Sequence, residues 1–391
     1  MKQLSDRIYY VGVNDEEKTL FEGLWPLPCG VSYNSYVVVD EKVALIDTVE
    51  GGFEEEFLEN VEAATGGRDV DYLVVNHMEP DHSSLISYMM EKYPSMRILA
   101  NAKTLPMLKG YYKVSEDRVM IVGEGESVSL GSCTLRFHMI PMVHWPETMV
   151  TWVEEEKTVF SGDAFGTFGA IPENVVDEDD TFEEYRDEMI RYYSNIVGKY
   201  GNPVQTALKK LSGLQIERIC STHGPVWEKN IPAVVGLYDR LSRYEVERGV
   251  CIAYGSMYGN TASAAQALAE ELEALGIPYA IHDLAGNNEE GLGVSGALRD
   301  AFKYDTIVVG SPTYNNSIYP PVETFMKALS ARLVKGRRFY AFGSYTWAGA
   351  SVRLLNELAS GMGFELLGEG MSFAQAYSPE KCDMAQVARM I

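Results

Sequence analysis

Four metal-ligand side chains, His77, Glu79, Asp81 and His82, stand within six consecutive residues of this sequence. They directly follow residues 72–76, a short apolar run with the composition of a buried strand. Side chains at the end of a strand can be held rigidly by the sheet behind them, as a metal site requires. This cluster therefore constrains the fold and the chemistry of the chain more than any other feature does.

Residues 83–93 carry apolar side chains at helical spacing, so the sequence predicts a helix there. We expect either Asp81 or Ser83 to cap its first turn. The four candidate ligands are thereby placed on a loop between a strand and a helix.

Three more candidate ligands also stand just after strand-like segments. His144 follows residues 134–142, Asp163 follows residues 158–162, and His223 follows residues 218–222. Of the six histidines in the chain, His138 and His282 lie inside strand-like runs, where a structural role is the simpler interpretation. Considered alone, any one of the histidines that follow a strand is best interpreted as an ordinary loop residue. Seven donors from four segments, however, match what two adjacent divalent metal ions need, so the joint pattern predicts a two-metal site.

This ligand pattern is similar to that of the metallo-β-lactamase superfamily, in which a His-x-His-x-Asp-His loop precedes further His, Asp and His ligands. Glu79 stands where that loop has its second histidine. An added carboxylate favours a carboxylate-bridged di-iron pair over a zinc pair. With 61, 18 and 59 residues between successive ligand segments, the chain resembles the flavodiiron proteins. The resemblance implies that His77, Glu79 and His144 bind one iron, that Asp81, His82 and His223 bind the other, and that Asp163 bridges them.

The second half of the chain contains another set of strand exits. Residues 250–254 form a strand-like run that leads into a small, hydroxyl-rich loop and then an alanine-rich helical stretch. Backbone N–H groups at such a helix start, together with serine and threonine hydroxyls, bind phosphate. The strand-like residues 306–310 and 338–342 end in further loops, whose aromatic side chains either stack on a flat ring or merely cap the sheet.

Together these three loops resemble those of flavodoxin, which hold FMN at the carboxyl ends of a parallel sheet. The resemblance implies that the first loop holds the phosphate and that the other two hold the isoalloxazine ring. The implied FMN-binding residues are Ser256, Met257, Tyr258, Gly259, Asn260 and Thr261 in the first loop, Pro312, Thr313, Tyr314 and Asn315 in the second, and Ser344, Tyr345, Thr346, Trp347, Ala348 and Gly349 in the third.

The expected fold class is α/β. A metallo-β-lactamase-like αββα sandwich is expected over residues 1–248, followed by a flavodoxin-like doubly wound parallel sheet over residues 249–391. A chain of 391 residues with 46% hydrophobic content is long and apolar enough for two globular domains. The charged residues 243–249, which follow a helix-like segment, mark the expected boundary.

Charge and cysteine usage narrow the possible partners. The formal net charge of −23 argues against nucleic acid, since phosphate binding rests on clustered lysine and arginine. Without a signal-peptide pattern or an apolar run of membrane-spanning length, we expect no membrane association and a cytoplasmic location. The five cysteines are scattered without a Cys-x-x-Cys pair, which argues against disulfides and against a fused rubredoxin-type iron centre.

The resemblance implies an enzyme that reduces O2 to water, NO to N2O, or both, with FMN and two iron ions per chain as cofactors. Its electrons would come from an external donor such as rubredoxin, a reduced deazaflavin or a nicotinamide-linked reductase. Family members form a head-to-tail homodimer or a dimer of dimers that sets the FMN of one chain beside the iron pair of another. We expect the same assembly here.

Two other functional classes stay open from the sequence. A di-zinc hydrolase would act on a thioester, lactam or phosphoester and use the flavodoxin-like half for docking or regulation, although Glu79 argues against zinc. A redox carrier or sensor would bind FMN and metal without rapid turnover, and reduced protein of that class would react slowly with O2 and NO.

The pocket over the metal ions is expected to decide between O2 and NO. Many relatives have Phe-His-Gly in this region, whereas this chain has Phe21, Glu22 and Gly23, so the role of the pocket histidine does not transfer. Glu22 is the candidate for donating a proton or for hydrogen-bonding to an iron ligand, and Trp25 and Tyr193 are candidates for lining the cavity. Glu22 and Tyr193 are thus the candidate catalytic residues, with a surface position and a helix-core position as their respective alternatives.

Overall fold

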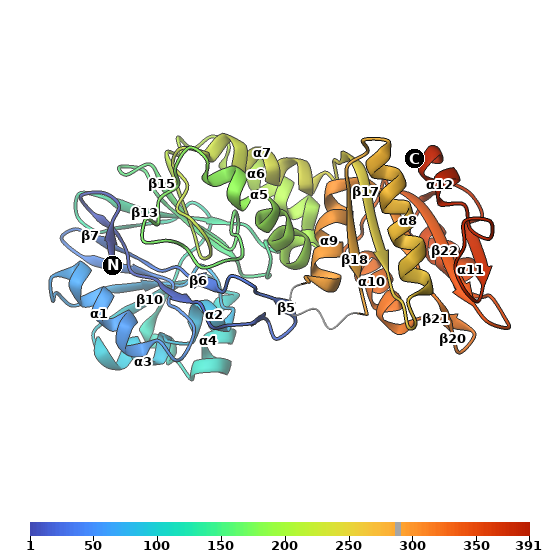
Figure 1. Ribbon diagram of the computed structural model, residues 1–391. Coiled ribbons are helices and arrows are strands. Elements are labelled where there is room, and N and C mark those ends of the chain that lie inside the picture. The colour runs from blue at the N-terminus through green and yellow to red at the C-terminus, as the bar shows by residue number, and fades with distance from the viewer. Residues whose placement is uncertain (286–290) are drawn as a thin grey trace. The chain divides into compact units, whose positions relative to one another are not determined.

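The computed structural model describes residues 1–285 and 291–391, which divide into two compact units (Figure 1). The first unit comprises Met1–Phe21, Leu27–Met189 and Asn202–Asp239, and the second comprises Glu22–Pro26, Ile190–Gly201 and Arg240–Ile391. A domain boundary at residues 248/249 stays a prediction.

Two β-sheets form the centre of the first unit. The order across the seven-stranded sheet is β1 (Lys2–Gln3), β2 (Ile8–Tyr10), β7 (Tyr36–Val39), β8 (Val43–Ile46), β9 (Tyr72–Val74), β10 (Arg97–Ala100) and β11 (Val119–Ile121). The order across the five-stranded sheet is β12 (Ser127–Ser129), β13 (Thr134–Met139), β14 (Met149–Val153), β15 (Thr158–Gly162) and β16 (Arg218–Ser221). Strands β8 to β11 are parallel to one another, as are β15 and β16, so several strands of each sheet open at one edge.

Helices cover the outer faces of these sheets. In Figure 1, α1, α3 and α4 lie outside the seven-stranded sheet, and α6 and α7 lie outside the five-stranded sheet, which makes an αββα sandwich. The helices are α1 (Glu54–Thr65), α2 (Pro80–Ser83), α3 (Ile86–Lys92), α4 (Thr104–Tyr112), α5 (Thr181–Tyr192), α6 (Gly201–Leu211) and α7 (Ile231–Ser242). The remaining short elements of the first unit are a 3-10 turn (Glu116–Arg118), β4 (Leu20–Phe21) and the antiparallel pair of β3 (Val13–Asp15) with β6 (Val31–Tyr33), whereas β5 (Trp25–Pro26) belongs to the second unit.

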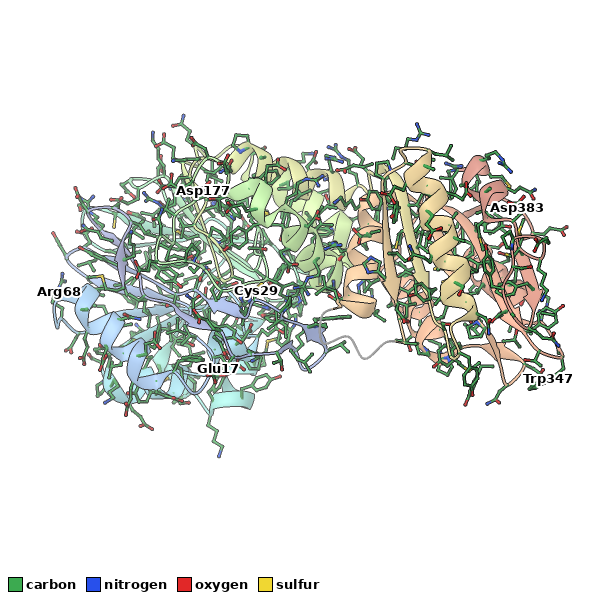
Figure 2. The ribbon with its side chains drawn as sticks, in the orientation of Figure 1. Glu17, Cys29, Arg68, Asp177, Trp347 and Asp383 are labelled. Atoms are coloured by element: carbon green, nitrogen blue, oxygen red, sulfur yellow. The ribbon has the colours of Figure 1, made fainter. Side chains whose placement is uncertain are left out.

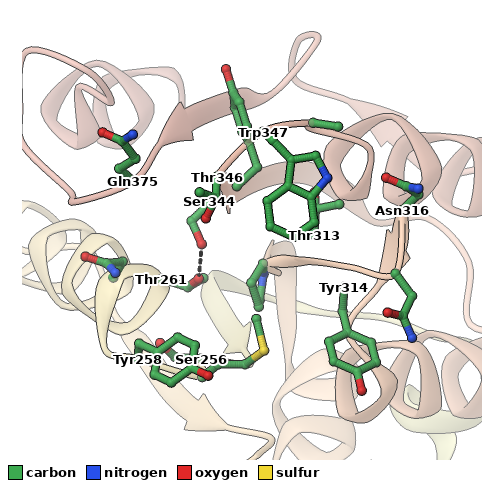
Figure 3. A pocket seen from close by; sticks show the side chains of 16 residues that line it. Ser256, Tyr258, Thr261, Thr313, Tyr314, Asn316, Ser344, Thr346, Trp347 and Gln375 are labelled. Atoms are coloured by element: carbon green, nitrogen blue, oxygen red, sulfur yellow. Dashed lines mark hydrogen bonds between the residues drawn. The ribbon is translucent and has the colours of Figure 1, made fainter.

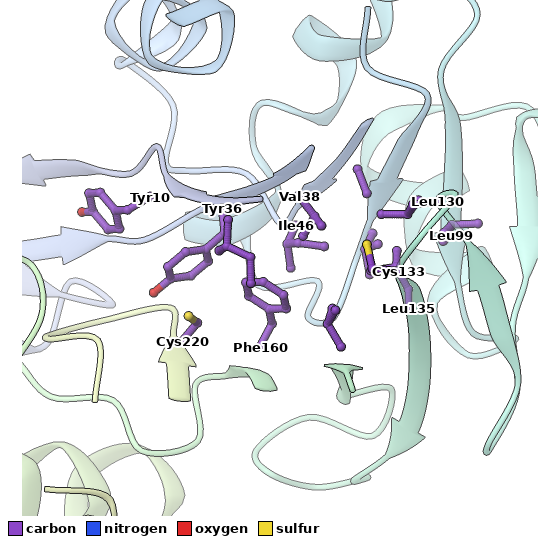
Figure 4. Packing of buried hydrophobic residues seen from close by; sticks show 14 of the residues in the cluster. Tyr10, Tyr36, Val38, Ile46, Leu99, Leu130, Cys133, Leu135, Phe160 and Cys220 are labelled. Carbon is purple, nitrogen blue, oxygen red and sulfur yellow. The ribbon is translucent and has the colours of Figure 1, made fainter. Parts of the chain in front are cut away.

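The core of the first unit lies between the two sheets. Val38 and Ile46 of one sheet and Leu135 and Phe160 of the other belong to a single cluster of buried side chains (Figure 4). The rings of Tyr36 and Phe160 lie 5.3 Å apart across this interface. Burial of these apolar faces fixes the sheets against each other, and with them the loops at their ends.

The second unit is a doubly wound α/β fold. Its sheet has the order β18 (Tyr279–Asp283), β17 (Glu247–Tyr254), β19 (Tyr304–Gly310), β22 (Arg338–Tyr345) and β23 (Glu365–Leu366), with β24 (Met371–Ala374) also paired to β22. All of these strands are parallel, and the order 2-1-3-4-5 is that of flavodoxin. The expected fold class is therefore confirmed for both units.

Helices flank this sheet, and α8 and α12 share one buried apolar cluster with it. The helices are α8 (Asn260–Ala274), α9 (Gly293–Lys303), α10 (Pro320–Ala331), α11 (Ser351–Gly361) and α12 (Met384–Met390). The unit also contains a π-helical turn (Tyr193–Val197), a 3-10 turn (Gly198–Tyr200) and the short pair β20 (Thr313–Tyr314) and β21 (Ser317–Ile318). None of the helices in the described residues combines the length and apolar character of a membrane span.

Candidate metal centre and ligand pocket

His77 and Glu79 lie on the turn between β9 and α2, as the sequence predicts, whereas Asp81 and His82 lie within α2, so the expected loop position is wrong for these two. Asp47 fixes the start of the turn, because its carboxylate accepts hydrogen bonds from the backbone N–H (2.7 Å) and the side-chain Nδ2 (3.1 Å) of Asn76. The hydroxyl of Ser83 fixes its end by donating to the carbonyl oxygens of Met78 (3.0 Å) and Glu79 (2.9 Å). Hydrogen bonds at both ends therefore hold the ligand side chains in place.

The prediction of one helix over residues 83–93 is wrong in its extent and in its cap. The chain forms two short helices there, α2 and α3. Neither Asp81 nor Ser83 is an N-cap, since Glu79 occupies that position of α2 and makes no side-chain capping bond. Pro80 starts the first helix, because its fixed φ and missing N–H suit the first helical position.

The other strand exits bring their ligands to the same place. Asp163 comes directly after β15 and His223 comes two residues after β16, and these neighbouring parallel strands leave the sheet together. The hydroxyl of Thr222 donates to Oδ1 of Asp163 at 2.5 Å. His144 stands on the loop that connects β13 to β14.

Four predicted ligands form one buried group, in which each residue offers one ligand atom and all four atoms lie within 4.8 Å of one another. The group consists of His77, Glu79, His144 and Asp163. Nε2 of His144 lies 3.0 Å from Oε2 of Glu79 and 2.8 Å from Oδ2 of Asp163. Nε2 of His77 lies 3.3 Å and 3.4 Å from the same two oxygen atoms.

The remaining three predicted ligands, Asp81, His82 and His223, form a second buried group. The Nε2 atoms of the two histidines lie 3.0 Å apart, and Oδ2 of Asp81 lies 3.3 Å and 3.4 Å from them. Oδ1 of Asp163 lies 3.1 Å from Nε2 of His82, whereas its Oδ2 faces the first group. Asp163 therefore presents one oxygen to each group.

Neither carboxylate oxygen of Asp81 accepts a hydrogen bond within the described part of the chain, although both atoms are buried. A buried carboxylate without hydrogen-bond donors is strongly destabilising unless a cation compensates its charge. The second group is thus incomplete without a positive ion.

The pKa values show the same need for positive charge. Burial acts to lower the pKa of His77, but nearby carboxylates, Asp163 foremost, raise it well above its usual range. Burial also acts to lower the pKa values of His82 and His144, but nearby carboxylates outweigh this effect and raise both pKa values to about 9. Burial acts to raise the pKa of Asp163, but His77 and His82 hold it well below its usual range. Without metal, the cluster would balance its carboxylates with protons on the histidines.

The donor set fits two metal ions. Two donors at about 2.1 Å and at right angles from one ion lie about 3 Å apart, close to the separations above. Four imidazoles and three carboxylates suit a carboxylate-bridged iron pair better than a zinc pair. Three carboxylates against two divalent ions leave about one positive charge, so little net charge is buried.

Several contacts outside the ligand set were not foreseen from the sequence. Nδ1 of His223 lies 2.7 Å from the carbonyl oxygen of Ser32, and the rings of Phe21 and Tyr33 contact the same imidazole. Glu147 lies against the outer nitrogen of the His77 imidazole. The available signal for Glu147 was its position three residues after His144.

Glu22 and Tyr193, the two candidate catalytic residues, both belong to the second unit. Glu22 is exposed, and its carboxylate accepts a hydrogen bond from the indole Nε1 of Trp25 at 3.0 Å. Tyr193 is fully buried at the start of the π-helical turn, with its ring 6.1 Å from that of Phe302. The catalytic role of both residues stays a prediction.

A cavity of about 370 Å³ opens at the carboxyl ends of β17, β19 and β22 (Figure 3). Every residue predicted to bind FMN lines it except Gly259 and Gly349. Asn316 and Gln375 also line the cavity and were missed. Gln375 directly follows β24, a strand that the sequence analysis did not identify.

Short hydrogen bonds shape the polar side of this cavity. The hydroxyl of Ser256 accepts a bond from the backbone N–H of Gly259 at 3.1 Å, just before α8 begins. The hydroxyls of Thr261 and Ser344 lie 2.9 Å apart and join the first loop to the third (Figure 3). Trp347 is 86% exposed, and Figure 2 shows it at the surface of its unit. The cavity thus combines hydroxyl groups at a helix start with exposed aromatic rings.

The fold and the two sites define a class of protein that joins a β-lactamase-like metal unit to a flavodoxin-like unit. Residues 31–224 match the family model described as ODP family beta lactamase, and residues 252–385 match the Flavodoxin model. A nitric oxide reductase from Moorella thermoacetica is 32% identical over 94% of this chain and 91% of its own length.

Solved structures agree over the whole chain. The rubredoxin oxygen:oxidoreductase from Desulfovibrio gigas has a TM-score of 0.91 at 28% identity, covering 100% of this chain and 96% of its own. The flavodiiron protein from Giardia intestinalis has a TM-score of 0.91 at 26% identity, with the same coverage of both chains. The chain belongs to the flavodiiron protein family. Its cofactors are FMN, for the flavodoxin unit, and a pair of iron ions, for the buried cluster of histidines and carboxylates.

Proposed function

We propose that this protein reduces O2 to water, NO to N2O, or both, at a non-haem di-iron site, with electrons passed through FMN from an external donor. The observation that carries the proposal is the buried set of four imidazoles and three carboxylates, in which one carboxylate faces both groups. The relatives named nitric oxide reductase and rubredoxin oxygen:oxidoreductase support the two activities.

The division of the ligands follows the two groups. We propose that His77, Glu79 and His144 bind the first iron, that Asp81, His82 and His223 bind the second, and that Asp163 bridges them. The two oxygen atoms of Asp163, one toward each group, support the bridging role.

The electron count fits both reductions. When bound, two ferrous ions supply two electrons and reduced FMN supplies two more, which equals the four electrons that convert O2 to two waters, whereas two NO molecules need only two. The chain's own residues bind the ions, exclude water by their burial and keep the ligand side chains oriented. Asp47 acts in this way through Asn76 at the start of the ligand turn, and Thr222 through Asp163.

In the second unit, we propose that residues 256–261 hold the FMN phosphate and that residues 312–315 and 344–349 hold the ring. The backbone N–H groups at the start of α8 and the hydroxyl of Thr261 support the phosphate role. The exposed ring of Trp347 supports a stacking role.

We further propose a head-to-tail homodimer, or a dimer of dimers, as the active assembly. Rubredoxin, a reduced deazaflavin or a nicotinamide-linked reductase would be the donor, and detoxification of O2 or NO the biological role. Tyr258 and Trp347 support a partner surface at the cavity, because they are 88% and 86% exposed. Turnover per chain that stays constant on dilution into the monomeric range would contradict the dimer.

The five free cysteines support a cytoplasmic location, where thiols are kept reduced.

Glu22 and Tyr193 remain our candidates for pocket residues that influence the reaction. Glu22 directly follows Phe21 in the sequence, and within the first unit the ring of Phe21 lies 5.3 Å from that of His223. Glu22→Gln and Tyr193→Phe test the proposal by the ratio of O2 to NO turnover, and unchanged ratios would contradict it.

The first experiment measures iron, zinc and FMN per chain in protein purified anaerobically without added metal. We expect about two irons and one FMN per chain, in keeping with the ligand set. The reduced protein is then mixed with O2 or NO in a stopped-flow instrument, and rapid oxidation at catalytic rates distinguishes a reductase from a carrier. Two zinc ions with little iron, or slow oxidation by both gases, would contradict the proposal.

Glu79→His is the matched control for metal choice. It restores the second histidine of the metallo-β-lactamase-type loop and removes one carboxylate from the first group. We expect this variant to retain more zinc and less iron than the parent protein when both metals compete.

A further inference from the structure

Glu147 is a fully buried carboxylate that contacts the metal centre without belonging to it. Its side chain is 0% exposed, and Oε1 lies 2.9 Å from Nδ1 of His77. The same oxygen accepts a hydrogen bond from the backbone N–H of Met78 at 3.0 Å. The other oxygen, Oε2, is buried and has no hydrogen-bond partner among the described residues. The charge of this carboxylate is therefore directed at the His77 imidazole.

The fold holds Glu147 in this position from several sides. The side-chain Nδ2 of Asn101 donates to the carbonyl oxygen of Glu147 at 2.5 Å. Lys103 donates to the carbonyl oxygen of Pro146 at 3.2 Å. The indole ring of Trp145 lies 5.2 Å from the imidazole of His77, at an interplanar angle of 84°. Segments far apart in the sequence thus place the carboxylate against this one histidine.

The histidines of the second group have no such partner. Nδ1 of His223 lies 2.7 Å from the uncharged carbonyl oxygen of Ser32. Nδ1 of His82 is buried and has no hydrogen-bond partner within the described chain. Each group has one carboxylate of its own and shares Asp163, and Glu147 adds to the first group a carboxylate in direct contact with an outer imidazole nitrogen.

A carboxylate on the outer nitrogen of a metal-binding imidazole has two effects. It fixes the proton on Nδ1, which leaves the Nε2 lone pair of His77 directed toward Glu79 and Asp163. It also makes the imidazole a stronger electron donor, which favours the more highly charged state of the metal at Nε2.

We propose that Glu147 is a positioning residue for His77 and makes the metal ion held by His77, Glu79 and His144 the more easily oxidised of the two. This inference rests on the proposed di-iron function. Removal of one electron per pair by an added one-electron oxidant leaves one ferric and one ferrous ion. The ferric ion is then the one in the first group.

The test compares Glu147→Gln, which keeps the shape and removes the charge, with Glu147→Asp, which keeps the charge. Asp177→Asn is the matched control, because Asp177 is equally buried but accepts its hydrogen bonds from Glu228, Lys229 and Asn230. We expect Glu147→Gln to bind iron about 10–100-fold more weakly. With saturating iron, its first oxidation should occur at a higher potential, while Glu147→Asp stays closer to the parent and Asp177→Asn does not differ from it.

Mössbauer spectra of half-oxidised protein loaded with 57Fe provide the site-specific readout. We expect Glu147→Gln to change the quadrupole splitting of the ferric component and to leave the ferrous component nearly unchanged. Full iron content with an unchanged potential would overturn the inference, and so would a change confined to the ferrous component.

Two further outcomes separate this inference from the proposed function. If the parent protein binds zinc instead of iron, the proposed function and the oxidation order both fail, while zinc affinity of Glu147→Gln still tests the positioning role. If Glu147→Gln does not fold, the diferrous parent protein is examined by proton NMR. A hyperfine-shifted, slowly exchanging Nδ1 proton on His77 supports the contact with Glu147, and its absence overturns it.

Discussion

The Nε2 atoms of His82 and His223 lie 3.0 Å apart inside the first unit, with their ring planes 62° apart. These residues are 141 positions apart in the sequence, and both side chains are fully buried. Two neutral imidazoles that direct the same kind of nitrogen at one point need either a shared proton or a cation between them. The adjacent carboxylate of Asp81, which lacks hydrogen-bond donors among the described residues, favours the cation.

Asp163→Asn should weaken both metal sites at once, because it replaces the charged carboxylate that faces both groups. Thr222→Val removes only the hydrogen bond to Oδ1 of Asp163 and should cost about 10–100-fold in iron affinity. We expect a larger loss for Asp163→Asn, measured as iron retained during titration with a chelator. Retention of two irons at the parent affinity by Asp163→Asn would contradict a bridging role.

Metal binding should release protons near neutral pH. In metal-free protein the pKa of His77 is raised well above its usual range, and the pKa values of His82 and His144 are raised to about 9, so all three are protonated at pH 7. A metal ion needs these nitrogens unprotonated and must displace the protons. Apparent affinity for ferrous iron should therefore rise with pH up to about 9, and iron should be lost on acidification.

A pH indicator in weakly buffered, anaerobic solution measures this release as ferrous iron is added to metal-free protein. Addition of iron to protein that already contains its metal is the control. The prediction fails if metal-free protein releases no protons at pH 7, or if affinity does not change between pH 6 and pH 9.

Trp347→Ala should weaken FMN binding without affecting the metal site. Trp347 lines the cavity of the second unit, and its exposed ring is available for stacking on a flat ligand. Stacking contributes about 0.5–1.5 kcal/mol beyond buried area, so affinity should fall by roughly 2–12-fold. Quenching of FMN fluorescence on titration of flavin-free protein measures the change. Tyr111→Ala, at a 57% exposed aromatic residue of the first unit, should bind FMN normally.

Phe160→Ala should destabilise the first unit by about 3–5 kcal/mol, because Phe160 is 1% exposed between the two sheets and packs on Tyr36. Phe160 also belongs to β15, the strand that carries Asp163 at its end, so iron retention should fall as well. Denaturant unfolding followed by near-ultraviolet circular dichroism measures the loss. Ile121→Ala, at a 44% exposed position, should change stability by about 0.5 kcal/mol or less.

Much of the fold follows from local patterns in the sequence. Residues 72–76 and 158–162 are apolar and β-branched, and the structure has β9 and β15 there. The spacing of apolar residues and the local composition are enough to predict such elements, because a buried strand needs apolar side chains on both faces. The predicted helix over residues 83–93 failed where a local pattern competes with the site, since Pro80 starts a short helix whose side chains also belong to the metal centre.

The cavity of the second unit likewise contains residues that local patterns predicted and residues that they missed. Its three main loops could be recognised because each follows an obvious strand and contains glycine, hydroxyl or aromatic residues. Gln375 could not, because β24 is short and its place in the sheet depends on pairing with β22. Local composition carries no information about which distant strand a short segment will join.

Local sequence patterns were enough to identify the residue types at the strand exits, and with them the seven candidate metal ligands that the fold brings together. The tertiary structure adds what no local pattern contains, namely the direction of each Asp163 oxygen and the contact of Glu147 with His77 across 70 positions of the chain. Ligand identity follows from side-chain chemistry and short-range spacing. The direction of each side chain and its outer partner depends on how two sheets pack, which is set by many weak contacts between residues remote in sequence.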